Sequence, residues 1–159
     1  MNQASHYIDL LDWLVGPVES VMAYTATQSR RIQVEDGGVA ALKWRSGALG
    51  TINVTMLTYP NNLEGSITII GDTGTVRVGG VAANKIEQWA FSNVEECDRN
   101  IFDLSYDVSS VYGAGHINYY QNVIEVLRGE SEPLTDGREG LKSLEILIAL
   151  YLSSRDGKR

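Results

Sequence analysis

The amino-terminal part of the chain changes from a helical to a strand-like pattern of apolar residues. Four apolar residues recur at intervals of three or four positions: Ala4, Ile8, Leu11 and Val15. This spacing predicts a helix over residues 4–15 with one apolar side. Gly16-Pro17 follows and is expected to end the helix. Residues 18–27 contain valine, threonine and tyrosine and predict a strand.

The middle of the chain consists of short apolar runs separated by turns. The runs that predict strands are Val39–Trp44, Ala48–Leu57, Ser66–Ile70, Thr75–Val78 and Ile86–Phe91. Apolar and polar residues alternate from Thr51 to Met56, which is typical of a strand with one buried face. Turns that contain glycine, at 45–47 and 71–74, join successive runs, so we expect antiparallel pairing. The polar stretch 92–112 predicts a long surface loop.

Two helices are predicted near the carboxyl terminus. The first has an apolar stripe over residues 117–127 and ends at Gly129. The second begins at Asp136-Gly137-Arg138-Glu139, which resembles a capping box, and ends at Gly157. We therefore predict an α+β domain over residues 1–159: a mainly antiparallel, open-faced sheet with its helices packed on one face. The uncovered face predicts association with a second copy or with another domain.

Length, charge and cysteine content narrow the possible functions. A chain of 159 residues fits one domain, and a formal net charge of −7 makes nucleic acids and membranes poor partners. The lone cysteine, Cys97, excludes an internal disulfide. No apolar run approaches the ~20 residues of a membrane span, and the first residues lack the pattern of a signal peptide. We therefore expect a cytoplasmic location.

The first predicted helix contains the best candidates for catalysis. Asn2 and His6 are four residues apart and His6 and Asp9 three apart, so all three share one face if the helix begins early enough. Histidine titrates near pH ~6.5 and is suited to take a proton from a hydroxyl, while Asp9 would orient the ring or contact the substrate. The alternative, which spacing alone favours, is a surface His–Asp pair on an amphipathic helix.

A second candidate site lies at Arg30 and Arg31, the densest basic spot in an acidic chain. Paired guanidinium groups suit a carboxylate or a pyrophosphate. The alternative is that both arginines are solvated charges that pair with Glu35 and Asp36.

His116 lies near the start of a predicted helix, where it either caps the helix or faces a pocket. The preceding Gly113-Ala114-Gly115 lacks the third glycine of a dinucleotide fingerprint, so no cofactor site is predicted there. The histidines and the cysteine are far apart in the sequence, so no metal site is predicted either.

Several motifs resemble the glucose–fructose oxidoreductase / inositol dehydrogenase family. The stretch from Asn2 to Asp9, followed by Leu11-Asp12-Trp13-Leu14, resembles the active-site helix of that family. Its closing two-helix pattern is matched in order by Gly115-His116, Tyr120, Ile124, Gly129, Pro133, Asp136-Gly137 and Tyr151-x-Ser153. The turn Gly71-Asp72-Thr73-Gly74-Thr75 is similar to the Gly-x-x-Gly turn of the family. The resemblance covers essentially the whole chain, but only the carboxyl-terminal domain of the family.

The resemblance implies the substrate-binding and oligomerisation domain of an NAD-dependent dehydrogenase. The chain is most similar to bacterial enzymes that oxidise the 3-hydroxyl of UDP-N-acetylglucosaminuronic acid in surface-polysaccharide biosynthesis. The resemblance implies that His6 is the general acid/base and that Asp9 is the acidic residue of the His-x-x-Asp pattern. Many members have aspartate where this chain has Asn2, which hydrogen-bonds a hydroxyl but accepts no proton. Arg30, Arg31 and His116 are then candidate substrate-binding residues.

The amino-terminal Rossmann domain of the family has no counterpart in this sequence. The sequence contains no Lys-Pro pair that would correspond to the family's Glu-Lys-Pro segment, whose lysine is part of the catalytic set. We therefore expect that this chain binds no NAD and is inactive alone. Two other hypotheses remain: a free-standing, non-enzymatic module that self-associates or binds a sugar, and an unrelated enzyme that uses His6 and Asp9 without an added cofactor.

Overall fold

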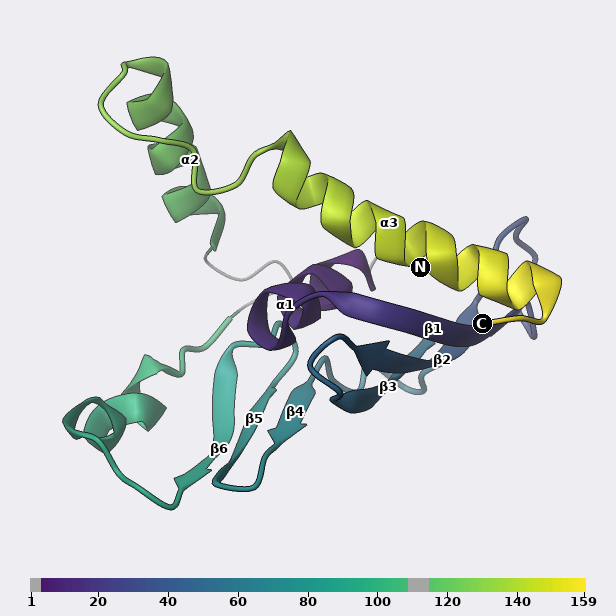
Figure 1. Ribbon diagram of the computed structural model, residues 1–159, viewed down its shortest axis with the longest axis horizontal. Coiled ribbons are helices and arrows are strands. Elements are labelled where there is room, and N and C mark those ends of the chain that lie inside the picture. The colour runs from purple at the N-terminus through teal and green to yellow at the C-terminus, as the bar shows by residue number, and fades with distance from the viewer. Residues whose placement is uncertain (1–3, 109–114) are drawn as a thin grey trace. The chain divides into compact units, whose positions relative to one another are not determined.

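The computed structural model describes residues 4–108 and 115–159 (Figure 1). The chain divides into two compact units, Met1–Thr58 with Thr135–Arg159, and Tyr59–Leu134. Each unit contains an antiparallel sheet and at least one helix. The α+β class predicted from the sequence is therefore confirmed.

The first unit is a three-stranded antiparallel sheet with two helices. Its elements are α1 (Ser5–Val15), β1 (Val18–Ala26), β2 (Gly37–Trp44), β3 (Leu49–Thr55) and α3 (Gly137–Asp156). The strands lie in the order β1-β2-β3, with Ala23 opposite Ala40 and Ala40 opposite Ile52. α1 ends where Gly16 adopts a φ of 99°, a conformation that glycine takes without the steric penalty of a Cβ.

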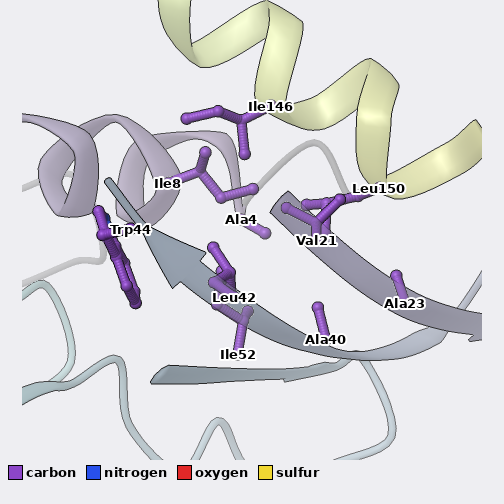
Figure 2. Packing of buried hydrophobic residues seen from close by; sticks show 10 residues of the cluster. All are labelled: Ala4, Ile8, Val21, Ala23, Ala40, Leu42, Trp44, Ile52, Ile146 and Leu150. Carbon is purple, nitrogen blue, oxygen red and sulfur yellow. The ribbon is translucent and has the colours of Figure 1, made fainter. Parts of the chain in front are cut away.

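One face of this sheet carries the core of the first unit. Buried and exposed residues alternate along β2, as expected for a strand with one covered face. The buried cluster consists of Ala4, Ile8, Val21, Ala23, Ala40, Leu42, Trp44, Ile52, Ile146 and Leu150. Figure 2 shows Ile8 of α1 and Leu150 of α3 pointing toward the strands. Both helices therefore cover the same face of the sheet, as predicted.

The end of α3 also covers the free edge of β1. The backbone N–H of Ala23 donates to the Ser153 hydroxyl at 3.1 Å, and the N–H of Thr25 donates to the Ser154 hydroxyl at 2.9 Å. An uncovered edge strand offers unpaired N–H groups to the strands of other chains. The two serines satisfy these donors and so protect this part of β1 from such pairing.

The second unit contains β4 (Ile67–Ile70), β5 (Gly74–Gly79), β6 (Lys85–Phe91), the 3₁₀ helix η1 (Glu96–Leu104) and α2 (Gly115–Leu127). Its strands are antiparallel in the order β4-β5-β6. The sequence predicted one sheet, whereas the described strands form two. Tight turns join the strands within the second sheet, but the link 56–66 between β3 and β4 is too long for a hairpin turn and contains Pro60.

Two local predictions are refined by the structure. The stretch 92–112, predicted as a loop, includes η1, whose entry is fixed by a 2.7 Å bond from the Glu95 N–H to the Asp98 carboxylate. At the start of α3, the Asp136 side chain accepts bonds from two backbone N–H groups, as a helix cap does. In a capping box the Glu139 carboxylate would accept a bond from the backbone N–H of Asp136. Here it accepts from the Lys142 ammonium at 2.8 Å instead.

Candidate functional site

α1 presents His6 and Asp9 to solvent. Ala4 and Ile8 are buried in the core, whereas His6 and Asp9 are both exposed. Residues three apart are neighbours on a helix surface, so the two side chains share one region of it. His6 is therefore accessible to a ligand, as a residue that takes a proton from a substrate must be. Asn2, the third member of the predicted set, lies outside the described residues.

Two other side chains of α1 have altered acidities. Burial raises the pKa of the Tyr7 hydroxyl. Burial also raises the pKa of the Asp12 carboxyl; the Lys142 ammonium opposes this rise, and the carboxylates of Asp9 and Glu139 add to it. The exposed surface around Asp9 is therefore locally acidic. The sequence did not single out Tyr7 or Asp12 because both effects depend on α1 packing into the unit.

The loop between β1 and β2, residues 27–36, carries Arg30 and Arg31. Its last residue, Asp36, is 1% exposed, and its carboxylate accepts three hydrogen bonds from the loop backbone. The donors are the N–H groups of Arg30, Gln28 and Ser29, each at 2.8 Å. These bonds lower the pKa of the Asp36 carboxyl because they stabilise its charged form.

The structure contradicts the alternative in which Arg30 and Arg31 pair with Glu35 and Asp36. Asp36 is occupied by backbone amides, and the Glu35 carboxylate accepts from the Tyr151 hydroxyl at 2.6 Å. Within residues 4–108 and 115–159, neither guanidinium group forms an ion pair; Arg30 Nη2 lies 3.5 Å from a backbone carbonyl oxygen. Both arginine side chains are exposed.

Sequence reasoning missed the role of Asp36, although a signal was present. An aspartate at the end of a loop, followed by Gly37-Gly38, is typical of side chains that bond to nearby backbone N–H groups. The neighbouring arginines suggested a charge pair instead. The bond between Glu35 and Tyr151 joins residues far apart in the sequence and had no local signal.

α1 and α3 pack against each other and run in opposite directions. Asp12, near the end of α1, is close to Lys142, while Ala4, before its start, shares the core with Leu150 (Figure 2). The two helices are thus antiparallel. The start of α1, which carries His6, therefore lies toward the half of α3 from which Tyr151 bonds to the arginine loop.

The structure does not bring His116 together with His6 within one unit. His116 is exposed in the first turn of α2, which belongs to the second unit. Gly113 and Ala114, which precede α2 in the sequence, lie outside the described residues. His116 is therefore accessible to a ligand, but its part in the site of His6 stays a prediction.

The open face of the first sheet is apolar in its centre. Three of its large side chains are well exposed: Tyr24 (68%), Val39 (50%) and Met22 (47%). A shallow depression lies beside Tyr24 and Val39, where Gly37 and Gly38 contribute no side chains. This face is the uncovered one that the sequence predicted.

The described residues contain neither a cluster of metal ligands nor a membrane-spanning helix. In residues 4–108 and 115–159, no three histidine, cysteine or acidic side chains gather to hold a metal ion. No helix in the same residues is long and apolar enough to cross a membrane. The strands described pair only antiparallel and so do not build the parallel βαβ unit that holds a dinucleotide.

Two solved structures are similar along 99% of this chain. One is the WlbA dehydrogenase of Bordetella pertussis in complex with NADH and UDP-GlcNAcA, which is 68% identical with a TM-score of 0.93. The other is the WlbA dehydrogenase of Chromobacterium violaceum with the same two ligands, which is 66% identical with a TM-score of 0.91. This chain covers 45% and 44% of those chains.

One more distant solved structure shares the fold, and one more distant curated protein is similar in sequence. A levoglucosan dehydrogenase in complex with NADH is 18% identical over 98% of this chain, with a TM-score of 0.75, and this chain covers 47% of it. The D-apiose dehydrogenase of Paraburkholderia graminis is 24% identical over 96% of this chain, which covers 42% of that protein. The chain thus spans less than half the length of each of these relatives.

A family model described as "Oxidoreductase family, C-terminal alpha/beta domain" matches residues 1–159. The match agrees with the motifs of the first and last helices and with the antiparallel α+β fold. The chain therefore belongs to this oxidoreductase family, as its C-terminal alpha/beta domain.

Proposed function

We propose that this chain is the substrate-binding and oligomerisation domain of an NAD-dependent dehydrogenase that acts on a nucleotide sugar such as UDP-N-acetylglucosaminuronic acid. The observation that carries the proposal is 66–68% identity, over 99% of the chain, with two dehydrogenases whose structures contain NADH and UDP-GlcNAcA. Activity then requires the part of these relatives that this chain does not cover, and the chain alone is inactive. A cytoplasmic location in a bacterium belongs to the same proposal.

In this proposal, His6 takes the proton from the sugar hydroxyl that is oxidised. Its exposure on α1 supports the role, and Asp9, three residues away, orients the imidazole or contacts the sugar. Asn2 hydrogen-bonds a sugar hydroxyl. Arg30, Arg31 and His116 bind the substrate.

The same proposal places NAD outside this chain. The proposal is supported by the described strands, which pair antiparallel, whereas a Rossmann-type dinucleotide site lies at the carboxyl ends of parallel strands. This chain contributes sugar binding and proton transfer; the acceptor of the hydride belongs to another domain.

The first test is calorimetric titration of the purified chain with UDP-N-acetylglucosaminuronic acid, with and without NAD. We expect saturable binding of the nucleotide sugar that NAD does not change. Absence of sugar binding would favour the non-enzymatic, self-associating module. Turnover by the chain alone without any cofactor would instead support an unrelated enzyme that uses His6 and Asp9.

The role of His6 is tested with His6→Ala in a full-length dehydrogenase that contains this domain. We expect kcat to fall by about 10²–10⁴-fold, the range typical of a lost general acid or base. The matched control is Asp72→Asn, a polar change in the exposed turn before β5, which should leave kcat unchanged. An unchanged kcat in His6→Ala would rule out the proposed role.

Self-association is proposed to use the open face of the first sheet, because Met22, Tyr24 and Val39 expose apolar surface there. Light scattering should detect an oligomer that Tyr24→Lys reduces to monomers. Tyr59→Lys is the matched control, since Tyr59 is 95% exposed and lies in the other unit. A strictly monomeric parent protein would contradict this part of the proposal.

A further inference from the structure

We infer that Asp36 is a positioning residue that holds the loop of Arg30 and Arg31 as a binding element for an oxyanion, a phosphate or carboxylate group of the ligand. The inference rests on the proposed function, in which both arginines contact a nucleotide sugar, and it adds the residue that prepares them for binding.

The loop backbone is held at several points. The Asp36 carboxylate binds three successive N–H groups, with Gln28 on Oδ1 and with Ser29 and Arg30 on Oδ2. The Thr27 hydroxyl donates to the Val34 carbonyl oxygen at 2.7 Å and closes the loop across its base. Arg30 therefore projects from a backbone that is already ordered. Less conformational entropy remains to be lost when a ligand binds.

The charges of the loop are separated in a way that favours an anion. The negative charge of Asp36 lies 1% exposed behind the loop and is stabilised by backbone amides. The Glu35 carboxylate is bonded to Tyr151. Arg30 and Arg31 are exposed and, within the residues described, lack an ion pair. Two adjacent guanidinium groups without carboxylate partners, in a chain of net charge −7, suit phosphate or carboxylate.

An asparagine at position 36 cannot replace the aspartate. Its side chain has one acceptor oxygen, and its NH₂ group would face at least one of the three N–H donors. Asp36→Asn therefore loosens the backbone of the arginines while keeping the size of the side chain. Tyr151→Phe removes the hydroxyl that bonds to Glu35 and loosens the same loop from its other side.

The test is a mutant cycle in a full-length dehydrogenase that contains this domain, read as KM and kcat for UDP-N-acetylglucosaminuronic acid. We expect the pair Arg30→Gln with Arg31→Gln to raise KM about tenfold or more with kcat unchanged, as loss of uniform binding does. Asp36→Asn should raise KM by a smaller factor. In the background that lacks both arginines, Asp36→Asn should have no further effect, because the arginines carry its contribution. Arg45→Gln, at an exposed turn arginine, is the matched control.

The outcomes test the arginine contacts and the positioning role of Asp36 separately. If removal of both arginines leaves KM unchanged, the arginine part of the proposed function fails, and this inference fails with it, while the His6 result stands independently. If KM responds to the arginines but Asp36→Asn has equal effects in both backgrounds, Asp36 is only structural and the inference is overturned. Should Asp36→Asn not fold, Tyr151→Phe replaces it in the cycle, with the same expectation and the same overturning result.

The chemical source of the anion is resolved by two binding titrations. Uridine diphosphate carries the phosphates without the carboxylate, and N-acetylglucosaminuronic acid carries the carboxylate without the phosphates. The arginine variants should lose affinity about tenfold for one of these probes, which assigns the loop to that group. Unchanged affinity for both probes would overturn the inference.

Discussion

The two sheets of this protein have the same number of strands and the same antiparallel order, yet different interactions hold them. In the first sheet, α1 and α3 bury apolar side chains against one face, and Ile8 and Leu150 are 1% and 0% exposed. Among the described residues of the second unit, Ile67 is the buried apolar side chain. Arg77 links the second sheet instead, with bonds to Glu87 at 2.6 Å, Glu64 at 2.8 Å and Thr68 at 3.2 Å.

The difference teaches that equal topology does not imply equal sources of stability. Burial of apolar area contributes roughly 25 cal/mol per Å² and is non-directional, so the first sheet depends on how much surface its helices cover. Exposed ion pairs contribute about 0–1 kcal/mol each and weaken in salt, so the second sheet depends on geometry and on ionic strength. Mutations of buried apolar residues should therefore destabilise mainly the first sheet, whereas added salt should weaken mainly the interactions of the second.

The largest expected effect is on the core of the first sheet. Leu150→Ala should reduce the free energy of unfolding by about 2–5 kcal/mol, because it leaves a cavity at a residue that is 0% exposed. Urea unfolding measures the loss. Leu144→Ala, on the same helix but 48% exposed, is the control and should cost well under half as much. Equal losses for the two variants would contradict the core described here.

A smaller effect is expected from a single methyl group in the second sheet. A Cβ on Gly74 would lie 2.3 Å from Phe91 Cδ1, so the ring must move. Gly74→Ala should cost about 1–3 kcal/mol in thermal unfolding, the range of overpacking. Near-ultraviolet dichroism should change too, because Phe91 packs edge-on to Trp89 at 5.2 Å.

The same hairpin offers a control for this prediction. A Cβ on Gly71 would meet its nearest atom at an ordinary 3.5 Å, so Gly71→Ala should be tolerated far better than Gly74→Ala. Phe91→Ala should relieve most of this packing conflict when it is combined with Gly74→Ala. A Gly74→Ala variant as stable as the parent would show that the ring does not rest on Gly74.

The smallest expected effect distinguishes the sheets by salt. Arg77→Met should lower the free energy of unfolding at low salt, since two exposed carboxylates lose their partner, and should lower it much less at 1 M NaCl. Lys43→Met, which removes the Lys43–Glu19 pair of the first sheet, should cost less than Arg77→Met at low salt. Unfolding in urea at both salt concentrations checks this. A salt-independent cost for Arg77→Met would argue for packing rather than charge.

Much of the fold could be predicted because it is local. The spacing of Ala4 and Ile8 gave both the first helix and its buried side, and the alternation along the strands gave the covered face. Pairing between strands is not local, so the separation into two sheets was not predicted. A strand's periodicity states which face is buried but not which strand lies beside it.

The candidate site, like the fold, could be predicted from the sequence only in part. The sequence by itself determined the family, the exposed His6 and Asp9 on the first helix, and the presence of two adjacent arginines. Only the tertiary structure decided what the acidic neighbours of those arginines do. Asp36 binds three backbone N–H groups, and Glu35 binds Tyr151 from the last helix. The physical reason is competition: a carboxylate beside an arginine also lies near backbone donors, and the folded loop determines which donors it reaches.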